Sequence, residues 1–138
     1  MSGRSALVVG GTGYLGQRIT DAFVRDGFRV AVLSRGQRPF DGLSESVERV
    51  CVDRHDRAVL QAELGPRMFD VVVDNVAFEA DEVASLLAVL EGRVGHYLLT
   101  SSTAVYANRF TRRPIREDGP IPTTAIHLPS PVSTRQRC

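Results

Sequence analysis

The chain has 138 residues, 43% of them hydrophobic and 24% charged, which is ordinary for one globular domain with a real core. The net charge of +1 argues neither for nor against a nucleic-acid partner; a basic cluster at Arg109, Arg112, Arg113 and Arg116 has no stacking aromatic beside it except Phe110, which favours a solvated tail over an RNA site. No apolar run approaches the length of a membrane span. The first residues lack the apolar core of a signal peptide, and two cysteines make no disulfide framework. We therefore expect a cytoplasmic protein with neither a membrane nor a nucleic acid as partner.

A glycine-rich stretch near the N-terminus predicts a phosphate-binding turn. Residues 7–9 form a short apolar run typical of a buried parallel strand, and Gly10, Gly13 and Gly16 follow at three-residue spacing. An amphipathic helical pattern begins at once. Strand, glycine turn and helix together are the context of a dinucleotide-binding fingerprint, although a purely structural turn is the alternative. The residues expected to contact the cofactor here are Gly10, Thr12, Gly13, Tyr14, Leu15 and Gly16.

The end of the second expected strand, residues 28–33, predicts which dinucleotide is preferred. In NAD sites an acidic residue after this strand holds the ribose 2′-OH, whereas an arginine suits the 2′-phosphate of NADP. The chain has no acid at 34–36; Ser34 and Arg35 stand there, and Arg38 follows. We expect Ser34 and Arg35 to bind the cofactor, and NADP to be preferred over NAD. A solvated arginine turn is the alternative.

The remaining elements alternate between strands and helices. We expect a loop at 36–46, a strand at 47–52, a helix from Asp53 or Asp56 to Leu64, a strand at 69–74, a helix with Val83, Leu86, Leu87 and Leu90 on one face, and a strand at 96–101. Cys51 is expected to be a buried thiol. The spacing of Cys51, Asp53, His55 and Asp56 matches no familiar zinc pattern, so no metal site is expected.

The spacing G-x-x-G-x-x-G after an apolar strand resembles the extended short-chain dehydrogenase/reductase family, which includes sugar-nucleotide epimerases and dehydratases. The resemblance implies that Asp53, after the third strand, meets the adenine amino group, with Arg54 beside it at the cofactor. It places Ala77 near the pyrophosphate and the nicotinamide ribose. The segment Ser-Ser-Thr-Ala-Val-Tyr at 101–106 resembles the one that carries the family's catalytic hydroxyl, which falls on Ser102.

The predicted fold is a doubly wound, Rossmann-like α/β domain with five parallel strands in the order 3-2-1-4-5. Its ligand is expected where the strand order reverses, between strands 1 and 4. We expect this dinucleotide-binding domain to occupy residues 1–106. Residues 107–138, which are rich in proline and arginine, are expected to form a loosely ordered tail.

The family's chemistry requires a tyrosine and, four residues later, a lysine, and the chain contains no lysine. The resemblance therefore covers only the N-terminal portion of a family member. Three hypotheses follow: an NAD(P)-dependent enzyme completed by another protein, a catalytically inactive nucleotide-binding regulator or sensor, and a truncated gene fragment. Because no sixth strand follows residue 101, we also expect the last strand to be an exposed edge that favours a homo-oligomer.

Overall fold

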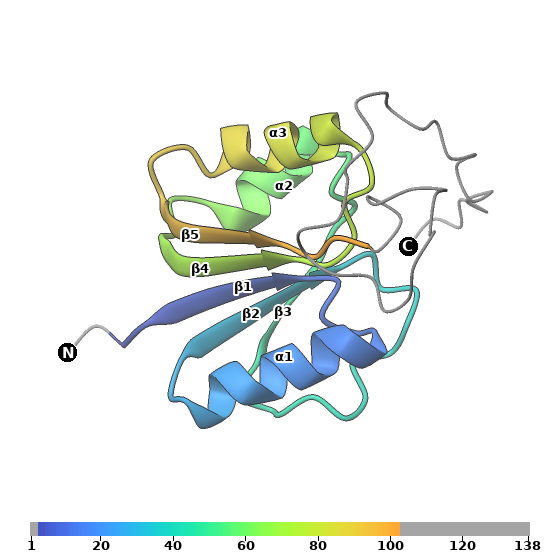
Figure 1. Ribbon diagram of the computed structural model, residues 1–138, viewed down its shortest axis with the longest axis vertical. Helices are drawn as coiled ribbons and strands as arrows, with labels where there is room; N and C mark the ends of the chain where they lie inside the picture. The colour runs from blue at the N-terminus through green and yellow to red at the C-terminus, as the bar shows by residue number, and fades with distance from the viewer. Residues whose placement is uncertain (1–2, 103–138) are drawn as a thin grey trace, which may run out of the picture. The chain divides into compact units, whose positions relative to one another are not determined.

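The computed structural model describes residues 3–102 and contains a five-stranded parallel sheet. The strands are β1 (Ser5–Val9), β2 (Arg29–Ser34), β3 (Glu48–Cys51), β4 (Phe69–Asp74) and β5 (Val94–Leu99). Their spatial order is β3-β2-β1-β4-β5, and every neighbouring pair is parallel (Figure 1). The predicted fold class and strand order are confirmed.

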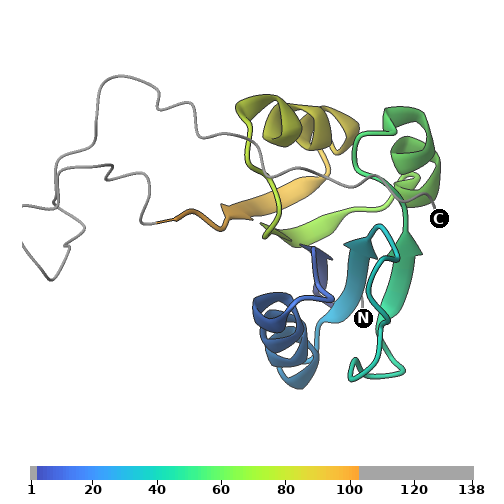
Figure 2. The same ribbon diagram turned by 90° about the vertical axis from the view of Figure 1, so that its right-hand side faces the viewer.

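Three helices cover the two faces of this sheet. Helix α1 (Tyr14–Arg25) lies on one face, and α2 (Arg57–Leu64) and α3 (Ala80–Val89) lie on the other (Figures 1 and 2). The side chain of Asp56 caps α2 by accepting a hydrogen bond from the Val59 N–H, 3.2 Å away. Of the two caps that the sequence allowed, Asp53 or Asp56, the structure therefore uses Asp56.

Two apolar clusters, one on each face, hold the layers together. On the face of α1, strand residues such as Val8 and Val32 pack with Leu43 and Val47, which come from the segment before β3. Leu43 and Val47 are 7% and 5% exposed. Helix α1 is therefore joined on this face by apolar side chains of the segment between β2 and β3. The opposite cluster includes Leu7, Val9, Leu33, Leu60, Leu64, Val72, Leu86 and Leu90.

Strand β5 begins two residues earlier than its sequence pattern predicts. Val94 already pairs with Phe69, and a Cβ on Gly95 would lie 2.8 Å from the carbonyl oxygen of Asp70. Gly95 therefore allows β5 to approach β4 closely, and it is not a turn residue. The turn is made by Gly92, whose φ is +69°. The strand ends at Leu99, two residues before its predicted end.

The buried face of α3 is rotated relative to the predicted one. Leu86, Val89 and Leu90 are buried, whereas Leu87 is 39% exposed. Successive residues of a helix point about 100° apart, so a face centred on Leu86 and Leu90 leaves Leu87 at its border. The apolar pattern alone could not distinguish these two directions.

Cys51 is exposed, which contradicts the expectation of a buried thiol. Successive residues of a strand point to opposite faces. Val50 and Val52, on either side of Cys51, are 2% and 4% exposed, and their side chains fill the core below the sheet. The cysteine is thus directed away from that core at an edge strand.

A boundary between two compact units of the chain falls after Thr100. The predicted boundary after Tyr106 and the proline-rich segment at 107–138 lie outside the described residues. Among the residues that are described, no helix is long and apolar enough to cross a bilayer.

Candidate functional site

At two of the fingerprint glycines, Gly10 and Gly16, a side chain would collide with its surroundings; the same holds for Gly11, whose Cβ would lie 2.6 Å from Val32 Cγ1. Gly10 has φ +79°, and a Cβ there would lie 2.5 Å from the Cγ1 atom of Val76. A Cβ on Gly16 would lie 2.2 Å from the carbonyl oxygen of Gly10. The turn is therefore packed tightly against the segment after β4, and α1 lies directly on the turn.

Gly13 differs from both, because its missing side chain leaves open space. A Cβ there would meet only the Gly10 carbonyl oxygen, at 3.9 Å, and the backbone angles of φ −79° and ψ 170° suit any residue. Gly13 is the N-cap of α1; no side chain caps that helix, and its first turn carries no acid. Helix α1 therefore presents N–H groups and partial positive charge where a ligand's phosphates can approach.

A cavity of about 410 Å³ lies beside this helix terminus, at the ends of β1, β2 and β4. Eight residues expected at the cofactor line it: Gly10, Thr12, Gly13, Tyr14, Leu15, Gly16, Ser34 and Arg35. Four more complete the lining: Gln37, Arg38, Asn75 and Val76. Gln37 was not assigned to the site from the sequence, although it lies within a few residues of the end of a parallel strand, where such ligands bind. Asn75 and Val76 belong to the stretch 75–78 that the family resemblance places along the cofactor, of which only Ala77 was named as a contact.

The other sequence-predicted site residues are not among those that line the cavity. Asp53 is exposed and accepts a hydrogen bond from the His55 N–H at 3.0 Å. Arg54 is only 7% exposed, and its guanidinium is turned to Asp74. The N–H of Ala77 donates to the same carboxylate at 3.1 Å. Ser102 is exposed and belongs to the unit after Thr100.

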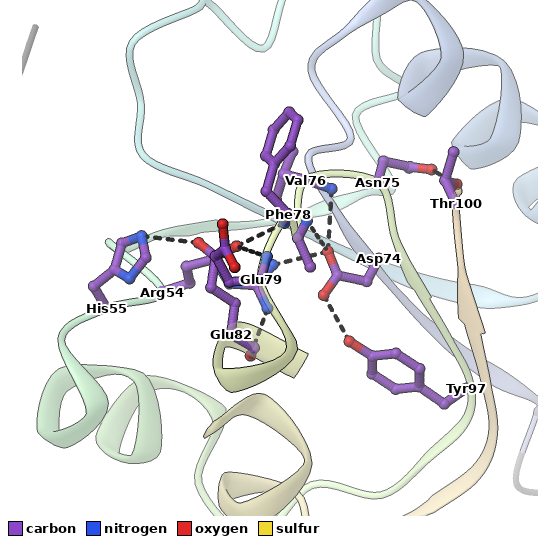
Figure 3. Close-up of polar contacts among 11 residues, drawn as sticks. Arg54, His55, Asp74, Asn75, Val76, Phe78, Glu79, Glu82, Tyr97 and Thr100 are labelled. Carbon is purple, nitrogen blue, oxygen red and sulfur yellow. Dashed lines mark hydrogen bonds and ion pairs between the residues drawn. The ribbon is translucent and has the colours of Figure 1, made fainter. Parts of the chain in front are cut away.

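The most extensive polar network in the described residues centres on Asp74, the last residue of β4, which is fully buried (Figure 3). Its carboxylate accepts hydrogen bonds from Arg54 at 2.8 Å and from the Tyr97 hydroxyl at 2.6 Å. Arg54 also donates to the backbone carbonyl of Glu82 at 2.8 Å. An aspartate ending a run of three valines was the sequence signal for this network, but its partners are 20 and 23 residues away.

The network shifts the pKa values of its members. Burial alone would raise the pKa of Asp74, but hydrogen bonds from Arg54 and Tyr97 outweigh it and hold the pKa below its ordinary value. Burial and the neighbouring Asp74 carboxylate both raise the pKa of Tyr97. Tyr97 therefore stays a neutral hydrogen-bond donor, and Asp74 stays an ionised acceptor, at neutral pH. No group of three potential metal ligands occurs within residues 3–102.

The fold and the cavity define a Rossmann-type dinucleotide-binding domain: a glycine turn, an uncapped helix terminus and a cleft at the point where the strand order reverses. The chain belongs to the NAD dependent epimerase/dehydratase family, whose model matches residues 6–127. This confirms the resemblance to the extended short-chain dehydrogenase/reductase family.

Individual proteins resemble this chain in sequence or in fold. The chloroplast stem-loop binding protein of 41 kDa b from Arabidopsis thaliana is 29% identical over 117 residues, which are 76% of this chain and 31% of the relative. UDP-glucose 4-epimerase from Bifidobacterium longum, solved with NAD+ and UDP, has a TM-score of 0.73 at 21% identity, covering 87% of this chain and 43% of the other. Epimerase Mth375 from Methanothermobacter thermautotrophicus has a TM-score of 0.73 at 20% identity, covering 89% and 42%. The chain thus spans less than half the length of these relatives.

Proposed function

We propose that this chain is the NADP(H)-binding portion of an epimerase, dehydratase or reductase of this family. The observation that carries the proposal is that one and the same cavity is lined by the uncapped N-terminus of α1 and by Arg35 and Arg38. Open space at Gly13 admits a pyrophosphate, and two arginines at the end of β2 supply cations on the adenosine side. The Bifidobacterium epimerase holds NAD+; the arginines are the reason to propose the phosphorylated form for this chain.

In an enzyme of this class the bound dinucleotide supplies hydride transfer to or from a substrate carbon. The residues described here would bind and orient that cofactor. The backbone of Gly13 and the first turn of α1 hold the phosphates, and Val76 bounds the cavity on the β4 side. Asp53, Arg54 and Ala77 are carried into the proposed site by the family resemblance alone, and the guanidinium of Arg54 is engaged by Asp74 and by the Glu82 carbonyl rather than by the cavity.

The first test concerns Arg35. We expect the wild-type protein to bind NADPH more tightly than NADH. Arg35→Ala should weaken the binding of NADPH by about 1.5–3 kcal/mol, because a charge-assisted contact to the 2′-phosphate is lost. NADH affinity should change little. Fluorescence titration of both cofactors against both proteins measures this. Equal affinity of wild type for the two cofactors, or an Arg35→Ala variant indistinguishable from wild type, would overturn the assignment.

A second prediction concerns catalysis. The family's proton transfer uses a tyrosine whose pKa is lowered by a nearby lysine, and this sequence contains no lysine. We therefore expect the purified chain to show no epimerase, dehydratase or reductase turnover above background. Ser102 could orient a substrate carbonyl, but it cannot replace that acid/base pair. Turnover that is abolished by Ser102→Ala would contradict this prediction.

Two alternatives share the same cofactor site. In one, another protein supplies the tyrosine and the lysine; in the other, the chain is an inactive nucleotide sensor. Dinucleotide binding combined with turnover only in the presence of a partner would favour the first.

The Arabidopsis relative is named for stem-loop binding. We propose no RNA surface for this chain, because its described residues carry 11 arginines against 14 acids.

We also propose that the chain self-associates through β5. This strand is at one edge of the described sheet, and its Leu98 and Leu99 side chains are 46% and 49% exposed. We expect the apparent mass to rise with concentration in light scattering, and Leu98→Lys to suppress that rise. A monomer across the whole concentration series, unchanged by Leu98→Lys, would mean that something other than a second copy covers this edge.

A further inference from the structure

The segment after β4 is held by an unusual set of hydrogen bonds. Four consecutive backbone N–H groups, those of residues 76–79, each donate to a carboxylate. Asp74 Oδ1 accepts from Val76 and Ala77, both at 3.1 Å. Glu82 Oε2 accepts from Phe78 at 2.7 Å and from Glu79 at 3.1 Å. Hydrogen bonds to ionised acceptors are about twice as strong as neutral ones, so this segment is held firmly.

Arg54 connects the two carboxylate-bearing residues. One guanidinium nitrogen lies 2.8 Å from Asp74 Oδ1, and the other lies 2.8 Å from the backbone carbonyl of Glu82 (Figure 3). Tyr97, from β5, donates to the second oxygen of Asp74 at 2.6 Å. Asp74 is fully buried and Arg54 is 7% exposed. We refer to Arg54, Asp74, Glu82 and Tyr97 as the carboxylate clamp.

The clamped segment is residues 76–79, and its first residue, together with the preceding Asn75, forms one wall of the cavity. Asn75 and Val76 line the cavity, and Val76 is packed against Gly10 so closely that a Cβ at Gly10 would be 2.5 Å from it. In a doubly wound fold the adenosine half lies over β2 and the pyrophosphate at the helix terminus. The opposite, nicotinamide half must then lie on the β4 side, beside the clamped segment.

We propose that Asp74 is a positioning residue for the nicotinamide half of the cofactor: through the clamp it fixes the wall formed by Asn75 and Val76. The inference rests on the proposed cofactor site. It has a second consequence. Because all four amides of 76–79 are already engaged by carboxylates, this wall offers the ligand no free backbone donors from those residues, and recognition of the phosphates is left to the terminus of α1.

The test compares a whole dinucleotide with its adenosine half. Calorimetry measures the affinities of NADP+ and of adenosine 2′,5′-bisphosphate for wild type and for Asp74→Asn, Tyr97→Phe and Asp70→Asn. Asp70 is the matched control: it lies on the same strand but at the opposite end, where its carboxylate accepts hydrogen bonds from Ser5. We expect Asp74→Asn to weaken NADP+ about tenfold or more while the adenosine fragment is unaffected. Tyr97→Phe should act in the same direction, and Asp70→Asn should leave both affinities unchanged.

Equal losses for dinucleotide and fragment, or no loss for either, would overturn the positioning role. Amide hydrogen exchange in ligand-free protein gives a second reading: residues 76–79 should exchange faster in Tyr97→Phe than in wild type, and unchanged exchange would refute the clamp. This reading keeps the inference testable if Asp74→Asn fails to fold. If wild type binds neither NADP+ nor NAD+, the proposed function fails, while the exchange experiment still decides whether the clamp exists.

Discussion

Replacing Gly13 by valine should abolish dinucleotide binding and leave the fold intact. The space in front of Gly13 is open to the cavity, so the new side chain would occupy the volume into which a pyrophosphate enters. The backbone there already has angles that valine adopts, and the fold loses only about 1 kcal/mol because valine is a poorer N-cap than glycine. We expect the affinity for NADPH to fall by about two orders of magnitude or more.

Gly16→Ala provides the contrast. Its Cβ would lie 2.2 Å from the carbonyl oxygen of Gly10 and 2.7 Å from Gly11 Cα, both backbone atoms that cannot turn away. We expect this substitution to lower the free energy of unfolding by about 1–3 kcal/mol or more. Circular dichroism with thermal unfolding, run beside a cofactor titration, separates the two effects. A folded Gly13→Val protein that still binds NADPH would show that the glycine loop is only a turn.

The second large effect is expected on stability. Arg54→Ala removes the cation beside the fully buried carboxylate of Asp74 and should lower the free energy of unfolding by about 3–5 kcal/mol. Tyr97 and the amides of Val76 and Ala77 would still donate to Asp74, but no positive charge would remain in contact with it. Denaturant unfolding at neutral pH measures the loss.

The matched control is Glu48→Gln, which breaks an ion pair with Arg67 at the surface. Glu48 is 57% exposed, so water screens that pair, and we expect a change of less than about 1 kcal/mol. A loss in Arg54→Ala no larger than in this control would contradict the structural role assigned to the buried pair.

The effect of Arg54→Ala should also depend on pH in a definite direction. The pKa of Asp74 is lowered in the folded protein from its ordinary 3.8, so the stability it contributes is present above about pH 4 and is lost as the pH falls through the folded pKa. The loss in the free energy of unfolding caused by Arg54→Ala is therefore expected to be greatest near neutral pH. It should become smaller in acid, where Asp74 becomes protonated. An equal loss in the free energy of unfolding at neutral pH and in acid would mean that lost packing, rather than charge, explains the effect.

Local patterns predicted most of the fold. The valine-rich run at Phe69–Asp74 was placed at its observed bounds, and the glycine turn after β1 was assigned correctly because its signals are neighbours in the chain. The bounds of β5 were predicted less accurately. From the sequence alone Gly95 is typical of a turn, and only its closeness to the Asp70 carbonyl shows that it belongs to a strand.

What the sequence by itself determined about this protein is the doubly wound class, the strand order and the glycine-rich half of the cavity. The class and the glycine turn follow from periodicity and from steric needs that act within a few residues, and the strand order follows from the right-handed connections of a doubly wound fold. Only the tertiary structure decided that Arg54, which was expected at the cofactor beside Asp53, turns inward to a buried carboxylate 20 positions away. The physical reason is that an ionised Asp74 at the end of a buried strand requires a cation and hydrogen-bond donors, and the pairing of β4 with β5 and the packing of α3 determine which residues can reach it.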